Sequence, residues 1–545
     1  MTSAHIDTFA TDNLPPVEQW PEFLLDLPEL RFPDRINCAA ELLDRHLAEG
    51  RGDRLCMRGP GVRWTYADLH ERVNRIAAVL VRDMGLVPGN RVLLNGPNTP
   101  MLAACWLAVV KAGGIAVTAM PLLRAKELAV MIDKARITHA LCDAAVADRL
   151  EPARSAGSTL DRVKYFNTAA ADGLEAAMAA HDGRFDAVAT AATDVCLIAF
   201  TSGTTGIPKA TAHFHRDVLA ICRCFPRHIV RPEPDDVFIG SPPLAFTFGL
   251  GGLVLFPMSI GASTVLLEQA GPPALAAAIA EYGATVLFTA PTAYRVLARE
   301  GAALRATPLR KCISAGEALS ASTRAQWREA TGIELIDGIG ATEMLHIFIS
   351  ADERHARPGA TGTAVPGYQA RVVDESGQPV GPGVVGRLAV KGPTGCRYLA
   401  DPRQTEYVRD GWNYTGDAYS MDEDGYFHFH ARADDMIVSA GYNIAAPEVE
   451  DALAAHAAVA DCAVIGAPDA ERGQIVEAYV VLRPEFPAGD ELIRELQHFV
   501  KETVAPYKYP RSIVFVEALP RTPTGKLQRF QLRRDPARDE TGVAR

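Results

Sequence analysis

The sequence predicts an α/β fold, with a large N-terminal domain of doubly wound layers, a β-rich subdomain and a small C-terminal α+β domain. The chain has 545 residues, and at roughly 100 to 200 residues per domain this length predicts several domains. Hydrophobic residues make up 48% of the chain and charged residues 22%, as in ordinary globular proteins. Short strand-like apolar runs alternate with helical patterns, which is typical of doubly wound α/β layers.

This alternation begins after Trp64. Apolar residues recur at helical spacing in 66–82 and again in 100–112, and a short apolar strand at 92–94 lies between them. Further strand-like runs separated by helical patterns follow at 114–117, 140–142, 195–200, 263–267 and 286–288.

The pattern changes twice toward the C-terminus. After about residue 362, Gly and Pro separate short apolar runs such as 385–390, as expected for antiparallel strands. From Asp434 onward, helical and strand-like runs mix again, which indicates a compact α+β domain. We therefore expect a large domain, a β-rich subdomain within it and a small domain at 1–433, about 362–433 and 434–545.

Composition excludes several classes of function. The 55 Lys and Arg against 66 Asp and Glu give a formal net charge of −11, so the chain has no general attraction for nucleic acid or an anionic membrane. Ten cysteines without a CxxC pair, and an N-terminus without a signal sequence, favour a cytoplasmic protein. The uncharged stretch 237–267 could span a bilayer by length, but its prolines and glycines favour buried strands. We expect a monomer or homodimer that binds small molecules.

The clearest local motif directly follows the run 195–200. It consists of small residues and a terminal lysine, in the order Thr201, Ser202, Gly203, Thr204, Thr205, Gly206, Ile207, Pro208 and Lys209. Its backbone N–H groups and hydroxyls can converge on phosphate oxygens while the lysine adds positive charge. A Walker A loop requires Gly before the lysine and Ser or Thr after it, so the P-loop interpretation fails. The motif predicts a polyphosphate cradle, with a Gly/Ser linker as the alternative.

Two other patterns are weaker. The glycines of 381–386 match the dinucleotide fingerprint, but they stand in a Pro-containing turn before a strand and do not open a helix. His213 and His215 have no Cys, Asp or Glu at ligand spacing, which favours two ordinary histidines over a metal site.

Six further motifs stand in order along the chain, at 314–318, 337–343, 414–417, 432–435, 441–444 and 520–526. Together with 201–209 they resemble the adenylate-forming superfamily of acyl-CoA synthetases, peptide-synthetase adenylation domains and luciferases. Within it, the segments 337–348 and 241–250 look most like benzoate-CoA ligases and 2-aminobenzoate-CoA ligases. The resemblance covers nearly the whole chain after about residue 60, and it implies ATP, Mg²⁺ and coenzyme A.

The resemblance also implies residue roles in nucleotide binding. Thr201 to Gly206 and Lys209 would bind the phosphates, Thr342 would contact the α-phosphate, and Glu343 would ligate Mg²⁺. The remaining nucleotide-binding residues would be Gly316, Glu317, Ala318, Asp337, Gly338, Ile339, Asp417 and Arg432. Of these, Asp417 and Arg432 would hold the ribose, and Ile339 stands where the superfamily usually has an adenine-stacking aromatic residue.

The implied reaction has two steps. Lys526 would neutralise charge as the carboxylate attacks the α-phosphorus and pyrophosphate leaves. The small domain would then swing about Asp434, remove Lys526 and bring Gly441 and Tyr442 beside the pantetheine of coenzyme A, whose thiol displaces AMP.

The resemblance places eight residues around the acid. They are Phe246, Phe248, Phe288, Ala315, Gly338, Gly340, Leu345 and His346, a mostly apolar set that suits a flat ring. We rank 2-aminobenzoate first, benzoate or a hydroxy or halo derivative second, and an aliphatic acid third. A non-catalytic nucleotide-binding protein and an adenylating oxygenase are the alternatives from other classes.

Overall fold

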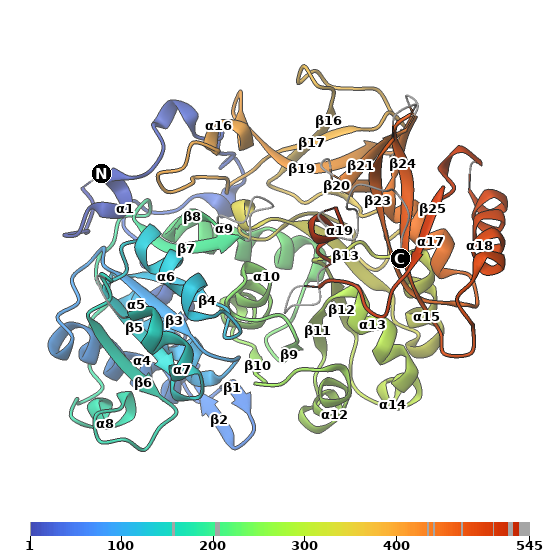
Figure 1. The fold of residues 1–545 in the computed structure, drawn as a ribbon. Coiled ribbons are helices and arrows are strands. Elements are labelled where there is room, and N and C mark those ends of the chain that lie inside the picture. Colours follow the sequence, from blue (N-terminus) through green and yellow to red (C-terminus); the bar gives the residue numbers. More distant parts are fainter. Residues whose placement is uncertain are drawn as a thin grey trace. The chain divides into compact units, whose positions relative to one another are not determined.

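The computed structural model describes residues 2–154, 158–201, 208–432, 435–439, 442–469, 472–504, 506–521 and 527–533 (Figure 1). The chain divides into two compact units. Met1–Ala370 with Ala389–Tyr414 forms the first unit, and Arg371–Leu388 with Thr415–Arg545 forms the second. The domain boundary expected at Asp434 falls on a residue outside the described ranges and inside the second unit, so it remains a prediction.

One layer of the first unit is a six-stranded sheet in the order β6-β5-β3-β4-β7-β8. The sheet is parallel except for β8, which runs antiparallel to β7. Short apolar runs separated by helices predicted this parallel arrangement. The strands are β3 (Arg91–Asn95), β4 (Ile115–Ala119), β5 (His139–Asp143), β6 (Arg162–Phe166), β7 (Val195–Thr201) and β8 (Lys209–Phe214).

A second layer of the same unit is a nine-stranded sheet in the order β15-β14-β13-β12-β11-β9-β10-β1-β2. Its central strands are parallel, and β2, β14 and β15 at the two ends are antiparallel to their neighbours. The strands are β1 (Leu55–Gly59), β2 (Val62–Thr65), β9 (Val237–Gly240), β10 (Ser263–Val265), β11 (Val286–Thr289), β12 (Lys311–Ser314), β13 (Leu335–Gly340), β14 (Ile347–Ser350) and β15 (Thr363–Ala364).

Helices connect and cover these strands. Helix α5 shows why such segments form: Thr99 caps its first turn by accepting the Leu102 N–H at 3.1 Å, Pro100 begins it, and all its residues are buried. The helices of this unit are α1 (Phe9–Asp12), α2 (Cys38–Leu42), α3 (Asp44–Ala48), α4 (Tyr66–Ala78), α5 (Pro100–Lys111), α6 (Ala125–Lys134), α7 (Ala147–Leu150), α8 (Leu174–Ala179), α9 (His215–Arg223), α10 (Thr247–Leu250), α11 (Phe256–Ile260), α12 (Pro272–Tyr282), α13 (Pro291–Leu297), α14 (Gly301–Arg305), α15 (Ala321–Thr331) and α16 (Gln404–Tyr407).

The uncharged stretch 237–267 is divided among several short elements. It contains β9, α10, a π-helical turn η7 (Gly251–Leu255), α11 and β10, as its prolines and glycines indicated. Among the described residues, no helix combines the length and the apolar character needed to cross a membrane.

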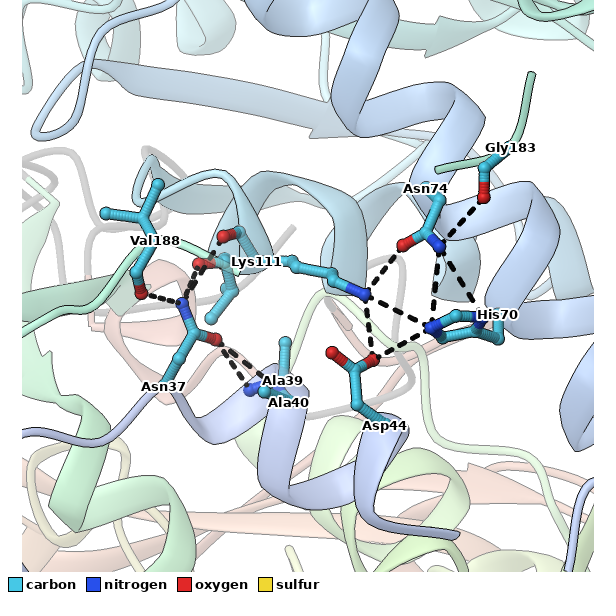
Figure 2. A network of polar contacts seen from close by, with 10 residues as sticks. Asn37, Ala39, Ala40, Asp44, His70, Asn74, Lys111, Gly183 and Val188 are labelled. Atoms are coloured by element: carbon cyan, nitrogen blue, oxygen red, sulfur yellow. Dashed lines mark hydrogen bonds and ion pairs between the residues drawn. The ribbon is translucent and has the colours of Figure 1, made fainter. Parts of the chain in front are cut away.

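A buried ammonium group joins α3, α4 and α5 (Figure 2). The Lys111 side chain is 1% exposed and donates to Asp44 Oδ1 at 2.8 Å and to Asn74 Oδ1 at 2.6 Å. Its Nζ also lies 3.4 Å from His70 Nε2. Burial lowers the pKa of Lys111, and Asp44 offsets part of that effect. Asp44 lies in α3, His70 and Asn74 lie on successive turns of α4, and Lys111 ends α5. The ammonium group therefore links the three helices.

The chain passes between the two units within β16 (Gln369–Val373), β17 (Gly386–Lys391) and β19 (Trp412–Met421). The turn at 381–386 leads into β17, as predicted, and opens no helix. In the first unit β18 (Val408–Arg409) pairs with the start of β19.

The second unit has an α+β core. Strand β24 pairs with β21, β23 and β25, and β19 pairs with β20. Side chains of α17 and α18 pack with those of β23 and β24 in one apolar cluster. Its elements are β20 (Phe427–Arg432), β21 (Met436–Ser439), β22 (Tyr442–Ala445), β23 (Val459–Asp469), β24 (Gly473–Leu482), β25 (Ser512–Phe515), α17 (Ala446–Ala454), α18 (Asp490–Thr503) and α19 (Arg529–Leu532).

Candidate active site

Most predicted site residues of the first unit lie at or after the carboxyl ends of four neighbouring parallel strands, β9, β11, β12 and β13 (Figure 1). Gly240 is paired with Phe288 and Thr289 with Ser314, so these ends form one edge of the sheet. In doubly wound sheets this edge binds the ligand. The residues gathered there are Phe246, Phe248, Phe288, Ala315, Gly316, Glu317, Ala318, Asp337, Gly338, Ile339, Gly340, Thr342, Glu343, Leu345 and His346.

The segment after β13 is held at both ends. Thr342–Met344 forms a single 3-10 turn (η9). His213 Nε2 lies 2.9 Å from its first carbonyl oxygen, and the Thr394 hydroxyl donates to its last carbonyl oxygen at 2.7 Å. Burial lowers the pKa of His213 to about 4, so the neutral ring is the donor at pH 7. The next residue, Leu345, is buried with a positive φ of 68°, a conformation that non-glycine residues rarely adopt.

The middle residue of this turn, Glu343, is held by its side chain. The hydroxyl of Tyr398 donates to Glu343 Oε1, and the Lys209 ammonium donates to the same hydroxyl oxygen at 3.2 Å. The other carboxylate oxygen, Glu343 Oε2, accepts no hydrogen bond from the described residues. Mg²⁺ prefers carboxylate oxygens as ligands. Glu343 therefore fits the role of metal ligand. Sequence reasoning missed Tyr398, which stands 55 positions from Glu343 and therefore gives no local spacing signal.

Behind this turn lies a buried ion pair that sequence reasoning also missed. Arg397 is fully buried and pairs with Asp217, and its guanidinium lies 3.8 Å from the centroid of the Phe214 ring. Asp217 also accepts the Phe214 N–H at 3.0 Å, next to the start of α9. The pair is 180 positions apart in sequence, so only the fold brings it together.

A cluster of aromatic rings surrounds His346; we call Phe225, Phe248, Phe256, Phe288 and His346 the ring cluster. The centroid of the His346 ring lies 4.5 Å from that of Phe256, 5.6 Å from that of Phe225 and 5.8 Å from that of Phe248. Phe248 and Phe288 are 5.7 Å apart. The structure thus brings together three residues that the sequence assigned to the acid, and it adds Phe225 and Phe256.

His346 is the only polar member of the ring cluster. It is 2% exposed, and neither ring nitrogen has a hydrogen-bond partner among the described residues. Burial lowers its pKa to about 3, and the nearby main chain of Phe248 has a smaller, opposite effect. A Cβ on Gly251 would lie 2.4 Å from His346 Cδ2, so only glycine fits against this ring.

The other residues predicted around the acid lie in or after strands β9, β12 and β13 of the same sheet. Phe246 is half-buried directly before α10, and Ala315 is buried directly after β12. Gly338 is buried in β13, and Gly340 is exposed at the end of that strand.

Five of the residues predicted to bind the nucleotide lie on two of these strand ends. Gly316, with a φ of 90°, and Ala318 are exposed after β12. Glu317 between them accepts the Thr292 hydroxyl at 2.5 Å. Asp337 is buried in β13, where burial raises the pKa of its carboxyl to about 6. Ile339 on the same strand is half-buried.

The two ends of the predicted phosphate motif are neighbours. Thr201 ends β7, Lys209 begins β8, and the two are paired across the antiparallel ladder. The residues between them that were assigned to phosphate lie outside the described ranges, as do three others from the prediction. These are Ser202, Gly203, Thr204, Thr205, Gly206, Asp434, Gly441 and Lys526.

In the second unit the two predicted ribose ligands face each other. Asp417 in β19 is paired with Arg432 in β20, and Arg432 Nη1 donates to Asp417 Oδ1 at 2.8 Å and to the Thr415 carbonyl at 3.2 Å. Tyr442 begins β22. The antiparallel ladder therefore orients a carboxylate and a guanidinium side by side.

His215 has neighbours that the sequence spacing did not indicate. Cys38 and Cys196, both buried, place their sulfur atoms within 4.8 Å of His215 and 4.0 Å from each other. His215 Nδ1 already accepts the Cys38 N–H at 3.2 Å.

Comparisons with known proteins agree with this geometry. The family model for AMP-binding enzymes matches residues 44–398, and the model for the AMP-binding enzyme C-terminal domain matches residues 448–526. A benzoate–CoA ligase from Thauera aromatica is 34% identical over 93% of this chain and 97% of its own length.

Two solved structures are similar over their whole lengths. An anthranilate CoA ligase in complex with anthranoyl-AMP superimposes with a TM-score of 0.85 and 31% identity, covering 93% of this chain and 98% of that one. A benzoate CoA ligase from Burkholderia xenovorans LB400 superimposes with a TM-score of 0.83 and 32% identity, covering 91% of this chain and 100% of that one.

Proposed function

We propose that this chain, which belongs to the AMP-binding enzyme family and is an AMP-forming acid–thiol ligase, activates an aromatic carboxylic acid. As a member of that family it uses ATP, Mg²⁺ and coenzyme A. The carboxylate attacks the α-phosphorus of ATP and pyrophosphate leaves, which gives an acyl-adenylate. The thiol of coenzyme A then attacks the acyl carbon and AMP leaves, which gives the thioester.

The ring cluster is the observation that carries the choice of an aromatic acid. Phe248, Phe288 and His346 lie at or after the strand ends where a ligand is expected, and the centroid separations of 4.5 to 6.2 Å within the cluster are those of interacting aromatic pairs. A flat aromatic acid would extend this arrangement with a further ring pair, whereas a long alkyl chain would form no aromatic pair. The benzoate and anthranilate ligases among the similar proteins support the same class of acid.

Among aromatic acids we propose 2-aminobenzoate. A buried imidazole without a hydrogen-bond partner lowers stability unless a ligand supplies one. Neutral His346 has one donor and one acceptor nitrogen, and an amino group on the ring of the acid can bond to the acceptor. Benzoate fills the same space without this bond and is the second candidate.

The nucleotide roles complete the proposal. Mg²⁺ would offset negative charge on the phosphates, and Glu343 would hold it while Thr342 contacts the α-phosphate. Lys209 and the motif before it would bind the outer phosphates, Asp417 and Arg432 the ribose. Lys526 would stabilise charge in the first step, and a swing about Asp434 would separate the two steps.

An acid panel tests the proposed activity. Purified protein with ATP, Mg²⁺ and labelled pyrophosphate should return label to ATP most efficiently with 2-aminobenzoate, then with benzoate, and least with hexanoate. Adding coenzyme A should convert the same acids to thioesters. A preference for hexanoate over every aromatic acid would overturn the proposed substrate class, and no exchange with any acid would overturn the assigned chemistry.

Two variants separate the steps. Lys526→Ala should abolish exchange, whereas Asp434→Pro should keep adenylate formation and block thioester formation. Equal loss of both steps in Asp434→Pro would contradict the hinge. Lys126→Met, at an exposed position on α6, serves as the matched lysine control and should behave as the unmodified protein.

A further inference from the structure

We propose that Tyr398 is a positioning residue whose hydroxyl separates the Lys209 ammonium from the Glu343 carboxylate, so that the carboxylate remains available for Mg²⁺. The proposal rests on the metal role of Glu343 proposed above. It assigns a function to a side chain that none of the sequence motifs contains.

The direction of the two hydrogen bonds follows from the chemistry of the groups. A lysine ammonium has only donors, so the Tyr398 oxygen accepts from Lys209, at 3.2 Å. The single hydroxyl hydrogen is then free to go to Glu343 Oε1, which it contacts closely. The hydroxyl thus stands between a cation and an anion and bonds to both.

Tyr398 is placed with little freedom. Its side chain is fully buried, its N–H donates to Gln404 Oε1 at 2.9 Å, and its backbone bridges to Thr211. Its ring contacts the ring of Tyr407 edge to face, with centroids 5.7 Å apart. Because both the backbone and the ring are fixed, the hydroxyl oxygen occupies a defined point.

Lys209 is attracted to the aromatic rings of Tyr398 and Tyr407. Lys209 Nζ lies 5.1 Å from the centroid of the Tyr398 ring and 5.9 Å from that of Tyr407, within the range of cation–π attraction. Among the described ion pairs there is none between Lys209 and Glu343, although both contact one hydroxyl group. The tyrosine oxygen therefore takes the place of a direct ion pair.

Without the hydroxyl, the two opposite charges would attract each other across a partly buried space. A direct ammonium–carboxylate bond is stronger than a bond to a neutral hydroxyl. It would reduce the negative charge that Glu343 offers to a metal ion, and it would turn Lys209 away from phosphate. The tyrosine thereby keeps two oppositely charged groups close together and each free for its own ligand.

Metal binding provides a readout other than turnover. We use Mn²⁺ as the probe at a fixed ATP concentration, and follow by electron paramagnetic resonance the change from the Mn²⁺–ATP spectrum to the protein-bound spectrum as protein is added. Tyr398→Phe should weaken Mn²⁺ binding by about tenfold, the scale seen when a residue that orients a metal ligand is lost. The KM for the acid should stay unchanged. Tyr294→Phe is the matched control, since it also removes a buried hydroxyl, one that donates to the Leu287 and Ile313 carbonyls.

Two further variants show whether charge separation is the cause. Glu343→Gln should weaken Mn²⁺ binding, and adding Tyr398→Phe to it should change nothing further. In a Lys209→Met background, where no ammonium can reach Glu343, Tyr398→Phe should cost less than about twofold. An equal effect of Tyr398→Phe with and without Lys209 would overturn the proposal.

The outcomes also distinguish this inference from the proposed site. If Glu343→Gln leaves Mn²⁺ binding unchanged, the metal role fails, and the role of Tyr398 fails with it. If Glu343→Gln weakens binding and Tyr398→Phe does not, only the role of Tyr398 is overturned. Should Tyr398→Phe not fold, Gln404→Leu displaces the same hydroxyl through the Tyr398 main chain. That variant should weaken Mn²⁺ binding about threefold, and unchanged binding there would overturn the proposal.

Discussion

Lys111 and His346 are both buried polar side chains of the first unit, yet their surroundings are opposite. The Lys111 ammonium lies between Asp44, Asn74 and His70, so its donors are used within the protein (Figure 2). Both nitrogens of His346 are without a partner among the described residues, and rings surround it.

The difference separates a structural site from a binding site. A buried polar group costs free energy unless it is hydrogen-bonded, so a satisfied group can be retained for stability alone. An unsatisfied one lowers the stability of the free protein and is explained by the ligand that satisfies it. We expect changes at Lys111 to alter folding and changes at His346 to alter substrate choice.

The largest effect is expected at Lys111. Lys111→Met leaves the Asp44 carboxylate, the Asn74 amide and the His70 imidazole without their cation. We expect the free energy of unfolding to fall by about 3 kcal/mol. Chemical denaturation measures it. The KM values of the folded variant for ATP and acid should not change, and a shift in either would place Lys111 in the site. The exposed Lys126→Met should change stability by less than about 0.5 kcal/mol.

A fall in pH should lower the free energy of unfolding, because His346 is buried without a hydrogen-bond partner among the described residues. Burial lowers the pKa of His346 in the folded protein to about 3 from the ordinary 6.5, so the unfolded chain binds more protons below pH 6.5 and stability is lost as pH falls. Between pH 7 and pH 5 this histidine alone should lower the free energy of unfolding by about 2 kcal/mol.

The His346→Leu variant isolates that contribution. Its stability should fall by about 2 kcal/mol less than that of the unmodified protein over the same pH range. Phe256→Leu is the control, because it disturbs the same cluster and removes no titratable group. An identical pH dependence for His346→Leu and the unmodified protein would contradict the buried neutral ring.

Substrate choice should respond to the same substitution on a smaller scale. If the His346 ring bonds to an amino group on the acid, His346→Leu should lower kcat/KM for 2-aminobenzoate about fivefold relative to benzoate, the value of one neutral hydrogen bond. Steady-state kinetics with the two acids measure the ratio. Phe256→Leu should affect both acids alike, and an unchanged ratio in His346→Leu would remove the argument for 2-aminobenzoate.

The smallest effect is expected at Ile339, an aliphatic side chain. Ile339 is half-buried at the strand end where the superfamily usually has an aromatic residue. Ile339→Tyr should lower the KM for ATP about threefold, since an aromatic pair adds roughly 0.5 to 1.5 kcal/mol beyond area burial. Ile339→Val should leave it within twofold. A KM that rises in the tyrosine variant would mean that adenine does not stack at this position.

Local patterns predicted the elements better than their pairing. Short apolar runs correctly indicated most of the parallel strands because burial of both sheet faces requires such runs. They gave no sign that β1 would pair with β10, more than 200 positions later, since that pairing depends on packing of the whole unit.

The candidate site divides in the same way. Phe248 and His346 belong to the contiguous segments 241–250 and 337–348, and Phe288 to the strand-like run 286–288, so the resemblance could assign them. Arg397 and Tyr398 act on Asp217 and Glu343 across long stretches of chain, and no spacing rule reaches them. Side chains that hold functional groups in place are therefore the part of the site that requires coordinates.

Only Met344 and Leu345 lie between Glu343 and His346, and the positive φ of Leu345 costs on the order of 1 kcal/mol. The chain can retain that conformation only because hydrogen bonds and rings fix the residues on both sides. The Glu343 carboxylate, proposed to bind the metal, and the His346 imidazole, proposed to bind the acid, are thus joined by one short rigid segment. A shift of the backbone in this segment that changed the preferred acid would also move the proposed metal ligand. New acid preferences must therefore arise from the rings that surround His346.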